Sequence, residues 1–248
     1  MTSPRGQSVI PRLTRYWPIA GLRVQISVGV AAGSASTLEL RLPDADDLAA
    51  LAALAESGVH DPAVQPFAMP WTDAEPAVRG RSVVQYHWRC LGSWSPDDWE
   101  LNLVVVRDGV VVGTQGIGAK GFGVVREVST GSWLGMEHQG KGTGTVMRAA
   151  VLALAFEGLG AEYARSEAFT DNPASLRVSR KLGYVDDGVD RIAVRGRAAE
   201  SLRLRIGREA WLAAGGASGL GIGDVAIGGL EPCLPLFGIG EAEPAEPG

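Results

Sequence analysis

A glycine-rich stretch near the middle of the chain constrains the fold more than any other feature. It runs from Ser132 to Thr145 and reads SWLGMEHQGKGTGT. A strand-like apolar run at 124–134 leads into it, and a helix-like run at 146–157 leads out. A strand, a turn and a helix in this order predict an anion site, because the first amides of a helix lack partners within the helix and the helix dipole is positive there. Glycines let a phosphate approach the backbone, and Lys141 adds a positive charge.

The spacing of the glycines restricts which phosphate ligand the turn can hold. The nucleotide loop G-x-x-x-x-G-K-[ST] does not fit, because Lys141 is followed by Gly142. The dinucleotide fingerprint G-x-G-x-x-G does not fit either, because Gly140, Gly142 and Gly144 recur at every second position. What remains is Gln139-x-x-Gly142-x-Gly144. On this motif alone, an ordinary glycine-rich turn between a strand and a helix stays open as an alternative.

The composition excludes several classes of protein. With 248 residues, 46% of them hydrophobic, the chain can bury a sizeable core without staples. Two distant cysteines and three scattered histidines offer no metal-ligand spacing and no Ser-His-Asp triad, so we expect no metal. The net charge of −5 argues against nucleic-acid binding and mildly favours a cationic substrate. We see no signal peptide and no apolar run approaching about 18 residues, so we expect a cytoplasmic protein without a membrane partner.

Hydrophobic periodicity predicts alternating strands and helices. Strands are expected at 22–30, 37–42, 99–106, 110–117, 124–134, 163–169, 184–189, 191–195 and 201–206. Helices are expected at 44–57, 78–91, 145–158 and 174–182, with a last helical turn at 208–214. The strand at 163–169 follows a helix, so it can pair in parallel with the strand at 124–134. The fold class is therefore α/β, a mixed and mostly antiparallel sheet flanked by helices.

This order and several local stretches resemble the GCN5-related N-acetyltransferase (GNAT) superfamily. SWLGMEHQGKGTGTVMRAAVLALAF resembles its acetyl-coenzyme A (acetyl-CoA) loop and helix, and DNPASLRVSRKLGY resembles its next motif. PWTDAEP, EVSTGSWLG and SLRLRIGREAW resemble the subgroup that acetylates the N-termini of ribosomal proteins (RimJ/RimL-like). The resemblance covers about residues 37–212 and implies the acyl-CoA N-acyltransferase fold. With the composition of the two ends, we expect a tail at 1–15, the acetyltransferase domain at 16–214 with an insertion at 28–36, and a flexible, acidic, Gly- and Pro-rich tail at 215–248. The apolar residues at 225–236 keep open the alternative that this part of the tail docks against the rest.

The resemblance also implies where acetyl-CoA binds. Its pyrophosphate is expected on the backbone amides of the turn. Its pantetheine arm is expected along the main chain at the end of the strand at 124–134, where a splay from the strand at 163–169 makes room. Asn172 and Ser175 match the family's second cofactor motif, and a plain helix N-cap with a first-turn serine is compatible with that role. The expected cofactor-binding residues are Trp133, Leu134, Gly135, Met136, Gln139, Gly140, Lys141, Gly142, Thr143, Gly144, Thr145, Asn172 and Ser175.

Acetyl transfer to an amine also needs a base and a proton for the departing thiolate. Freeing a lysine-like amine at neutral pH costs roughly 4–5 kcal/mol, which a nearby carboxylate can offset by accepting the proton. Relatives often carry a glutamate at the position that we align with Ser129, which cannot act as a base. Glu127 lies two residues away on the same strand face and is our candidate base. Weaker candidates are Asp97, Asp98, Glu100 and Glu167. Many family members use a tyrosine where this chain has Ser179, so Ser179 is the candidate proton donor; the alternative is that this step needs no protein acid.

These residues predict direct attack by a primary amine on bound acetyl-CoA in a ternary complex. The acceptor is either a protein N-terminal amine, as in the subgroup above, or a small amine such as an antibiotic, a polyamine or an amino acid. A non-catalytic acyl-CoA-binding module is the alternative from another class, because the tyrosine is missing and Ser129 replaces the glutamate. We expect the protein to be a monomer or a homodimer.

Overall fold

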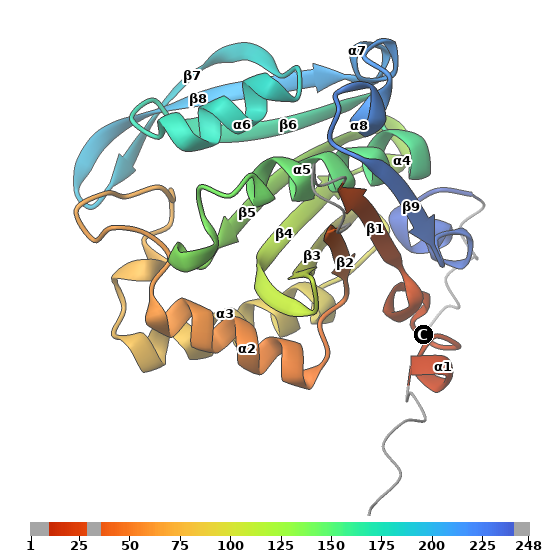
Figure 1. The fold of residues 1–248 in the computed structure, drawn as a ribbon, viewed down its shortest axis with the longest axis horizontal. Coiled ribbons are helices and arrows are strands. Elements are labelled where there is room, and N and C mark those ends of the chain that lie inside the picture. Colours follow the sequence, from red (N-terminus) through yellow and green to blue (C-terminus); the bar gives the residue numbers. More distant parts are fainter. Residues whose placement is uncertain (1–9, 29–35, 241–248) are drawn as a thin grey trace, which may run out of the picture.

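One nine-stranded sheet organises the computed structural model, which describes residues 10–28 and 36–240 (Figure 1). The strands are β1 (Arg23–Val28), β2 (Ser36–Arg41), β3 (Asp98–Arg107), β4 (Val110–Lys120), β5 (Glu127–Leu134), β6 (Tyr163–Phe169), β7 (Val185–Val194), β8 (Arg197–Gly207) and β9 (Asp224–Gly228). The α-helices are α1 (Ile10–Leu13), α2 (Ala45–Ser57), α3 (Pro76–Gly92), α4 (Phe122–Val125), α5 (Thr143–Ala153), α6 (Pro173–Lys181), α7 (Arg208–Ala213) and α8 (Gly216–Gly219). Short 3₁₀ turns are η1 (Pro18–Gly21), η2 (Trp71–Asp73), η3 (Met136–His138) and η5 (Glu231–Phe237), and η4 (Leu154–Gly158) is a π-helical end of α5.

The strand order confirms the predicted fold class. Across the sheet the strands lie in the order β7-β8-β6-β5-β4-β3-β2-β1-β9. Neighbours pair antiparallel except β5 and β6, which pair in parallel as the intervening helix predicts. This one parallel pair sits in the middle of the sheet, and the glycine-rich stretch directly follows its first strand.

The two faces of the sheet are covered by different helices. In Figure 1, α2 and α3 lie together on one side, and α5 and α6 lie on the other. Alternation along β3 supplies both cores, because successive side chains point to opposite faces. Leu101 and Leu103 join the large core under α5, whereas Val104 joins a smaller core with Leu51 of α2 and Val83 of α3. The side on which a β-strand residue points therefore decides whether it meets α5 or the α2–α3 pair.

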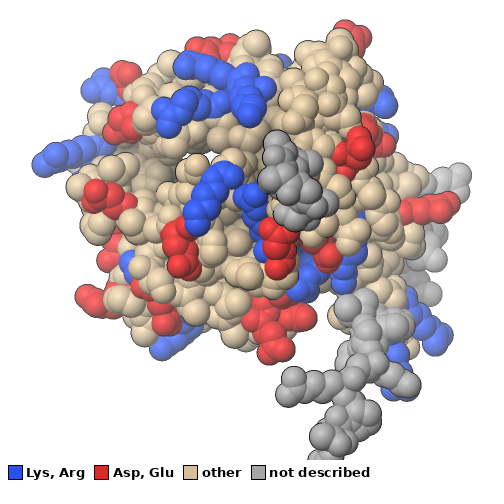
Figure 2. Space-filling view, viewed as in Figure 1, with Lys and Arg blue, Asp and Glu red and all other residues tan. Residues whose placement is uncertain are grey.

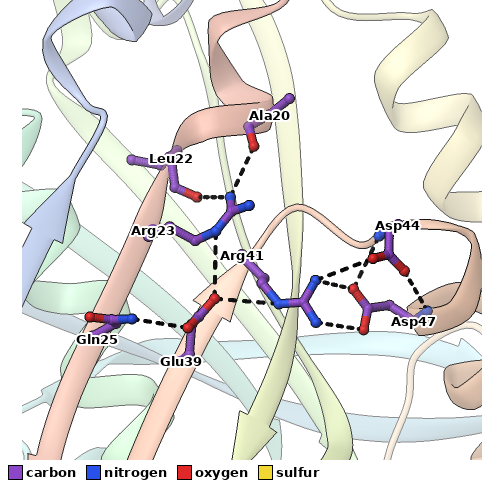
Figure 3. Close-up of polar contacts among 8 residues, drawn as sticks. All are labelled: Ala20, Leu22, Arg23, Gln25, Glu39, Arg41, Asp44 and Asp47. Carbon is purple, nitrogen blue, oxygen red and sulfur yellow. Dashed lines mark hydrogen bonds and ion pairs between the residues drawn. The ribbon is translucent and has the colours of Figure 1, made fainter. Parts of the chain in front are cut away.

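An ion-pair network attaches the start of α2 to the sheet (Figure 3). Arg41 of β2 donates to both carboxylate oxygens of Asp47, one of them at 2.8 Å. Asp47 and Asp44 also form a reciprocal capping box, which satisfies free amides at the helix start. Glu39 lies between Arg41, at 3.3 Å, and Arg23, at 3.5 Å. The network attaches the N-terminal end of α2 to β2.

Several element boundaries differ from the sequence prediction. The two strands expected at 184–189 and 191–195 are one strand, β7, whose register shifts around Gly188. Its partner β8 begins at Arg197, four residues earlier than expected. The stretch at 122–125 is helical, so β5 begins only at Glu127. Residues 1–9 and most of the expected insertion at 28–36 lie outside the described residues.

The prediction of a flexible tail is wrong for residues 215–240. They form α8, β9 and η5, and β9 extends the sheet by pairing with β1. Cys233 and Phe237 are fully buried, and Phe237 packs against Trp94 and Trp99. The glycine-rich composition concealed this order because strand pairing uses backbone groups, while the apolar side chains scattered between the glycines pack against the core. Residues 241–248 lie outside the described residues.

Candidate active site

The turn between β5 and α5 exposes a row of unpaired backbone amides. Gly142 caps α5 with φ of 78°, and Gly140 has φ of 70°, both in the left-handed region that favours glycine. The first amides with partners are those of Thr145 and Val146, which donate to the Gly142 carbonyl. Within the described ranges, the amides from Gly140 to Gly144 donate to no protein acceptor. This arrangement is suited to an anion, because several donors and the helix dipole converge on one point.

Two side chains hold the turn in place. The Gln139 amide donates to the carbonyl of Val59 at 2.6 Å and to that of Leu134 at 2.9 Å. On the other side, Arg107 at the end of β3 donates to the Thr143 hydroxyl at 2.6 Å. Gln139, predicted to contact the cofactor, is thus a brace between the turn and the loop after α2. Arg107 gave no signal in the sequence, because it becomes relevant only when β3 ends beside the turn.

Positive charge surrounds the start of α5. In Figure 2, Lys and Arg side chains gather over α6 and near the start of α5. The exposed basic residues of α6 are Arg177, Arg180 and Lys181. Helix α6 lies beside the turn, since a Cβ on Gly144 would lie 3.8 Å from Val178. A polyanionic ligand on the free amides would therefore also meet cationic side chains.

Asn172 and Ser175 form the start of α6. The Asn172 side-chain oxygen accepts the Ser175 amide at 3.1 Å, so Asn172 is the helix N-cap. This confirms the plain structural interpretation of the pair. Both residues are half-buried. Their contact with the cofactor stays a prediction.

The predicted splay between β5 and β6 is present. The strands pair only where Glu127–Ser129 meets Tyr163–Arg165. Beyond that, the edge of β5 from Thr130 to Leu134 faces no strand on the β6 side, and β6 pairs only with β8. The Thr130 hydroxyl reaches across and donates to the Arg165 carbonyl at 3.1 Å. The open end of the splay adjoins the turn.

A buried polar cluster lies on the α5 side of the splay. Arg148 of α5, only 5% exposed, donates to Ser166 of β6 at 2.9 Å and to Ser132 of β5 at 3.2 Å. The Tyr184 hydroxyl is 3.3 Å from that of Thr130, and burial raises the pKa of Tyr184, so it keeps its proton. Arg148 thus spans the two separating strands and brings a positive charge beneath them. In the sequence, Arg148 is notable only as a single arginine within a mostly apolar helix, and it belongs to neither cofactor motif.

The last residues of β5 and those after it make different contacts. Leu134 is in the core, and Trp133 packs on Trp71 with ring centroids 5.8 Å apart. The Gly135 amide donates to the Val112 carbonyl, and the Met136 amide donates to the Gly58 carbonyl. Gly135 and Met136 therefore have no free amide for a pantetheine arm, which leaves the edge of β5 itself.

Glu127 lies at the closed end of the splay. Its carboxylate pairs with Arg165 at 2.9 Å and with Arg205 at 2.7 Å, and its side chain is 16% exposed. Both carboxylate oxygens are therefore already occupied by guanidinium groups, which leaves neither of them facing an amine. Its position in the first paired residues of β5 also separates it from the open end. The structure thus places Glu127 on the expected face but in a setting that disfavours the predicted role.

Ser179 is fully buried on α6, and its hydroxyl has no hydrogen-bond partner among the described residues. Buried hydroxyls are almost always paired, so this one is available to a group not present among the protein atoms. The predicted role as a proton donor stays a prediction.

Aromatic side chains line the other face of the sheet beside the splay. Phe67 and Trp71, from the loop after α2, stack toward Trp133 of β5. The same loop is tied to the β7–β8 hairpin by an ion pair between Asp73 and Arg195. The hydrogen bond from Arg195 lowers the pKa of Asp73, so the pair is charged at neutral pH. This ion pair links the loop after α2 to the β7–β8 hairpin on the face of the sheet opposite α5.

Comparison with known proteins identifies the family. The family model described as acetyltransferase (GNAT) domain matches residues 37–185, more than half of the chain. The chain belongs to the GNAT acetyltransferase family. Similar structures include RimJ from Mycobacterium smegmatis in complex with CoA-disulfide, at 20% identity and TM-score 0.58, covering 77% of this chain and 94% of that one. RimL, a ribosomal L7/L12 alpha-N-protein acetyltransferase in complex with coenzyme A, has 16% identity and TM-score 0.56, covering 73% and 97%.

The similar structures also include a small-molecule enzyme. Mutant forms of the spermidine/spermine N-acetyltransferase SpeG from Vibrio cholerae have 18% identity and TM-score 0.56, covering 72% of this chain and 98% of that one. At these identities the similarity shows the fold, and it determines neither the acceptor nor the site residues of this GNAT acetyltransferase. Among residues 10–28 and 36–240, no helix has the length and apolar character to span a bilayer.

Proposed function

We propose that this GNAT acetyltransferase transfers the acetyl group of acetyl-CoA to the N-terminal amine of a protein, by direct attack in a ternary complex. The observation that carries the proposal is the turn at 140–144, with free amides beside a splayed strand pair. The family supplies the co-substrate, and the turn fits its pyrophosphate because free amides and nearby cations favour phosphate oxygens.

Each part of the site has a role in this proposal. The amides from Gly140 to Gly144 and Lys141 hold the pyrophosphate, and the free edge of β5 from Thr130 to Leu134 aligns the pantetheine arm. Arg148, beneath the splay, places a positive charge where negative charge develops on the departing thiolate. Ser179, or the protonated Tyr184, returns a proton to that thiolate.

The charges on the acceptor side favour a single amine over a polyamine. A polyamine carries several ammonium groups, which are best matched by several free carboxylates. On this face Glu127 and Asp73 are paired with arginines, whereas Glu100 is held by hydrogen bonds and forms no ion pair with another described residue, so a single carboxylate is left to meet a single ammonium group. Phe67, Trp71 and Trp133 instead present an apolar wall, which suits the first side chains of a peptide.

A thiol-release screen tests the proposal. Purified protein is incubated with acetyl-CoA and either peptides with free N-termini or small amines, and free CoA is measured together with the mass of the product. We expect CoA release that depends on a peptide and a product heavier by one acetyl group at its N-terminus. Faster turnover of spermidine or an antibiotic would instead support the small-amine alternative. Tight acetyl-CoA binding without turnover of any amine would support the non-catalytic alternative.

A further inference from the structure

Glu100 of β3 is a carboxylate that is held by hydrogen bonds from neutral groups. It points to the α2–α3 face and is half-buried. One oxygen accepts the Tyr86 hydroxyl and the Asn102 amide, the latter at 3.4 Å, and the other accepts the Cys90 thiol at 3.7 Å. Within the part of the chain that the structure describes, no Lys, Arg or His forms an ion pair with it. A partly buried carboxylate that lacks a counter-ion is a site that an ammonium group would complete.

The groups around Glu100 all act as donors. Burial, followed by the hydrogen bond to Glu100, raises the pKa of Tyr86. Burial likewise raises the pKa of Cys90 to about 11, so neither group loses its proton at neutral pH. The guanidinium of Arg89 lies 5.3 Å from the centre of the Tyr86 ring, on the outer side of α3. Because Tyr86 and Cys90 stay protonated, Glu100 is held as their acceptor and keeps lone pairs for a further donor.

Glycines direct Glu100 toward β5. The cross-strand rows on this face are Glu100–Gly118–Ser129 and Asn102–Gly116–Gly131. A Cβ on Gly118 would lie 3.4 Å from the Glu100 Cγ, so the side chain leans over the position that a larger residue would fill. Ser129 and Gly131 are exposed beyond it, and a Cβ on Gly131 would meet nothing within 4 Å. The surface of β5 next to Glu100 is therefore open at Ser129 and Gly131, where β5 and β6 begin to separate.

Geometry and charge together favour Glu100 over Glu127. Both lie on the same face, but Glu127 is neutralised by Arg165 and Arg205, whereas Glu100 has only neutral donors. Glu100 is also in the same cross-strand row as Ser129, two residues further along β5 than Glu127. Gly118 of β4 lies between Glu100 and Ser129 and has no side chain, so the Glu100 carboxylate can extend from β3 across β4 toward β5.

We propose that Glu100 binds the ammonium group of the acceptor and takes its proton, so that β3 supplies the carboxylate that Ser129 cannot. The proposal rests on the proposed acetyltransferase function. The N–H bond of the ammonium breaks and its proton passes to Glu100. The freed nitrogen lone pair then attacks the thioester carbonyl carbon, and the C–S bond breaks with its electron pair leaving on the thiolate. The thiolate takes the proton of the Ser179 or Tyr184 hydroxyl, which is replaced by the second nitrogen proton, and Glu100 releases its proton to solvent.

The test compares Glu100→Gln with Glu127→Gln, two equal changes on the same face. Amine-dependent CoA release gives kcat/KM over a pH range, and calorimetry gives the affinity for CoA. We expect Glu100→Gln to lower kcat/KM for the amine by about 10²–10³-fold, with CoA affinity kept. The deficit should shrink as pH approaches the pKa of the acceptor amine, because the amine then needs no base. The loss in Glu127→Gln should be at least about ten-fold smaller.

A double variant and a binding measurement complete the test. Ser129→Glu in the Glu100→Gln background restores a carboxylate in the same cross-strand row, and we expect it to recover part of the lost rate. Binding of the amine to the CoA complex, followed by calorimetry, should weaken in Glu100→Gln alone. Wild-type kcat/KM and amine affinity in Glu100→Gln, or a larger loss in Glu127→Gln, would overturn the inference. Absence of amine-dependent turnover in the unmodified protein would instead overturn the proposed function, so the two failures are distinguishable.

Discussion

The conformation of Gly142 gives the sharpest test of the phosphate-binding turn. Its φ of 78° lies in the left-handed region, and a Cβ there would meet no atom within 4 Å. Gly142→Ala therefore creates no clash and costs about 1–2 kcal/mol of left-handed strain in the free protein. If the turn relaxes to relieve that strain, two or so of its amides no longer point at one phosphate. At about 1.5–3 kcal/mol for each hydrogen bond to a charged group, this is roughly 3–6 kcal/mol of binding energy.

The expected result is a loss of acetyl-CoA affinity of about 10²–10⁴-fold, measured by isothermal titration calorimetry. Gly160→Ala is the matched control. Gly160 has φ of 69° and equally open surroundings, but it follows the far end of the α5 helix. Both variants should lose a similar, small amount of stability, whereas only Gly142→Ala should lose affinity. Unchanged affinity in Gly142→Ala, or an equal loss in both variants, would refute the assignment of the turn.

Three further outcomes follow from individual contacts. Phe237→Ala should lower the free energy of unfolding by about 3–5 kcal/mol, because Phe237 is fully buried in the C-terminal segment. The expected fall in Tm is roughly 6–20 °C, and an unchanged Tm would mean that the segment is not docked. Burial raises the pKa of Cys90 and of Cys233 to about 11. The native protein should therefore not react with a disulfide reagent at pH 8 within minutes, whereas the unfolded protein should react at both thiols. Rapid labelling of the native protein would contradict this. Arg195 lowers the pKa of Asp73, so their ion pair is present above the usual aspartate range and is lost as pH falls through the lowered pKa. Limited proteolysis of the loop at 58–75 should therefore be faster in acid, and faster in Asp73→Asn at neutral pH. Equal cleavage would contradict the proposal that this ion pair holds the loop.

The turn could be predicted from the sequence because its requirements are local. Gly140 and Gly142 adopt left-handed conformations, a strand precedes them and a helix follows, and all of this is encoded within about twenty residues. The parallel pairing of β5 with β6 followed for the same reason, since a helix connects the two strands.

The choice among the candidate bases, Glu127 first and Glu100 among the weaker ones, depends on contacts that are not local in sequence. Periodicity placed Glu127 on the correct face of β5, but its neutralisation by Arg165 and Arg205 depends on which strands become neighbours. The position of Glu100 likewise depends on a glycine on the adjacent strand, at 118. Side-chain contacts between strands are set by register, which a single strand's sequence does not contain.

The C-terminal segment shows a different limit. Its glycine content is typical of flexible chain, yet the backbone of β9 pairs with β1 whatever its side chains are. Phe237 and Cys233 anchor it in the core, among many small residues. Averaged composition hides the apolar residues of this segment, which lie between the glycines and pack against the core.

A residue-level binding measurement tests the central claim most directly. Backbone amide resonances of the protein are followed by two-dimensional NMR while CoA is added to saturation. We expect the largest shifts on the amides from Gly140 to Thr145, followed by the free edge of β5 from Thr130 to Leu134. Largest shifts elsewhere, or none at saturating CoA, would contradict the claim that this turn and splay hold the co-substrate.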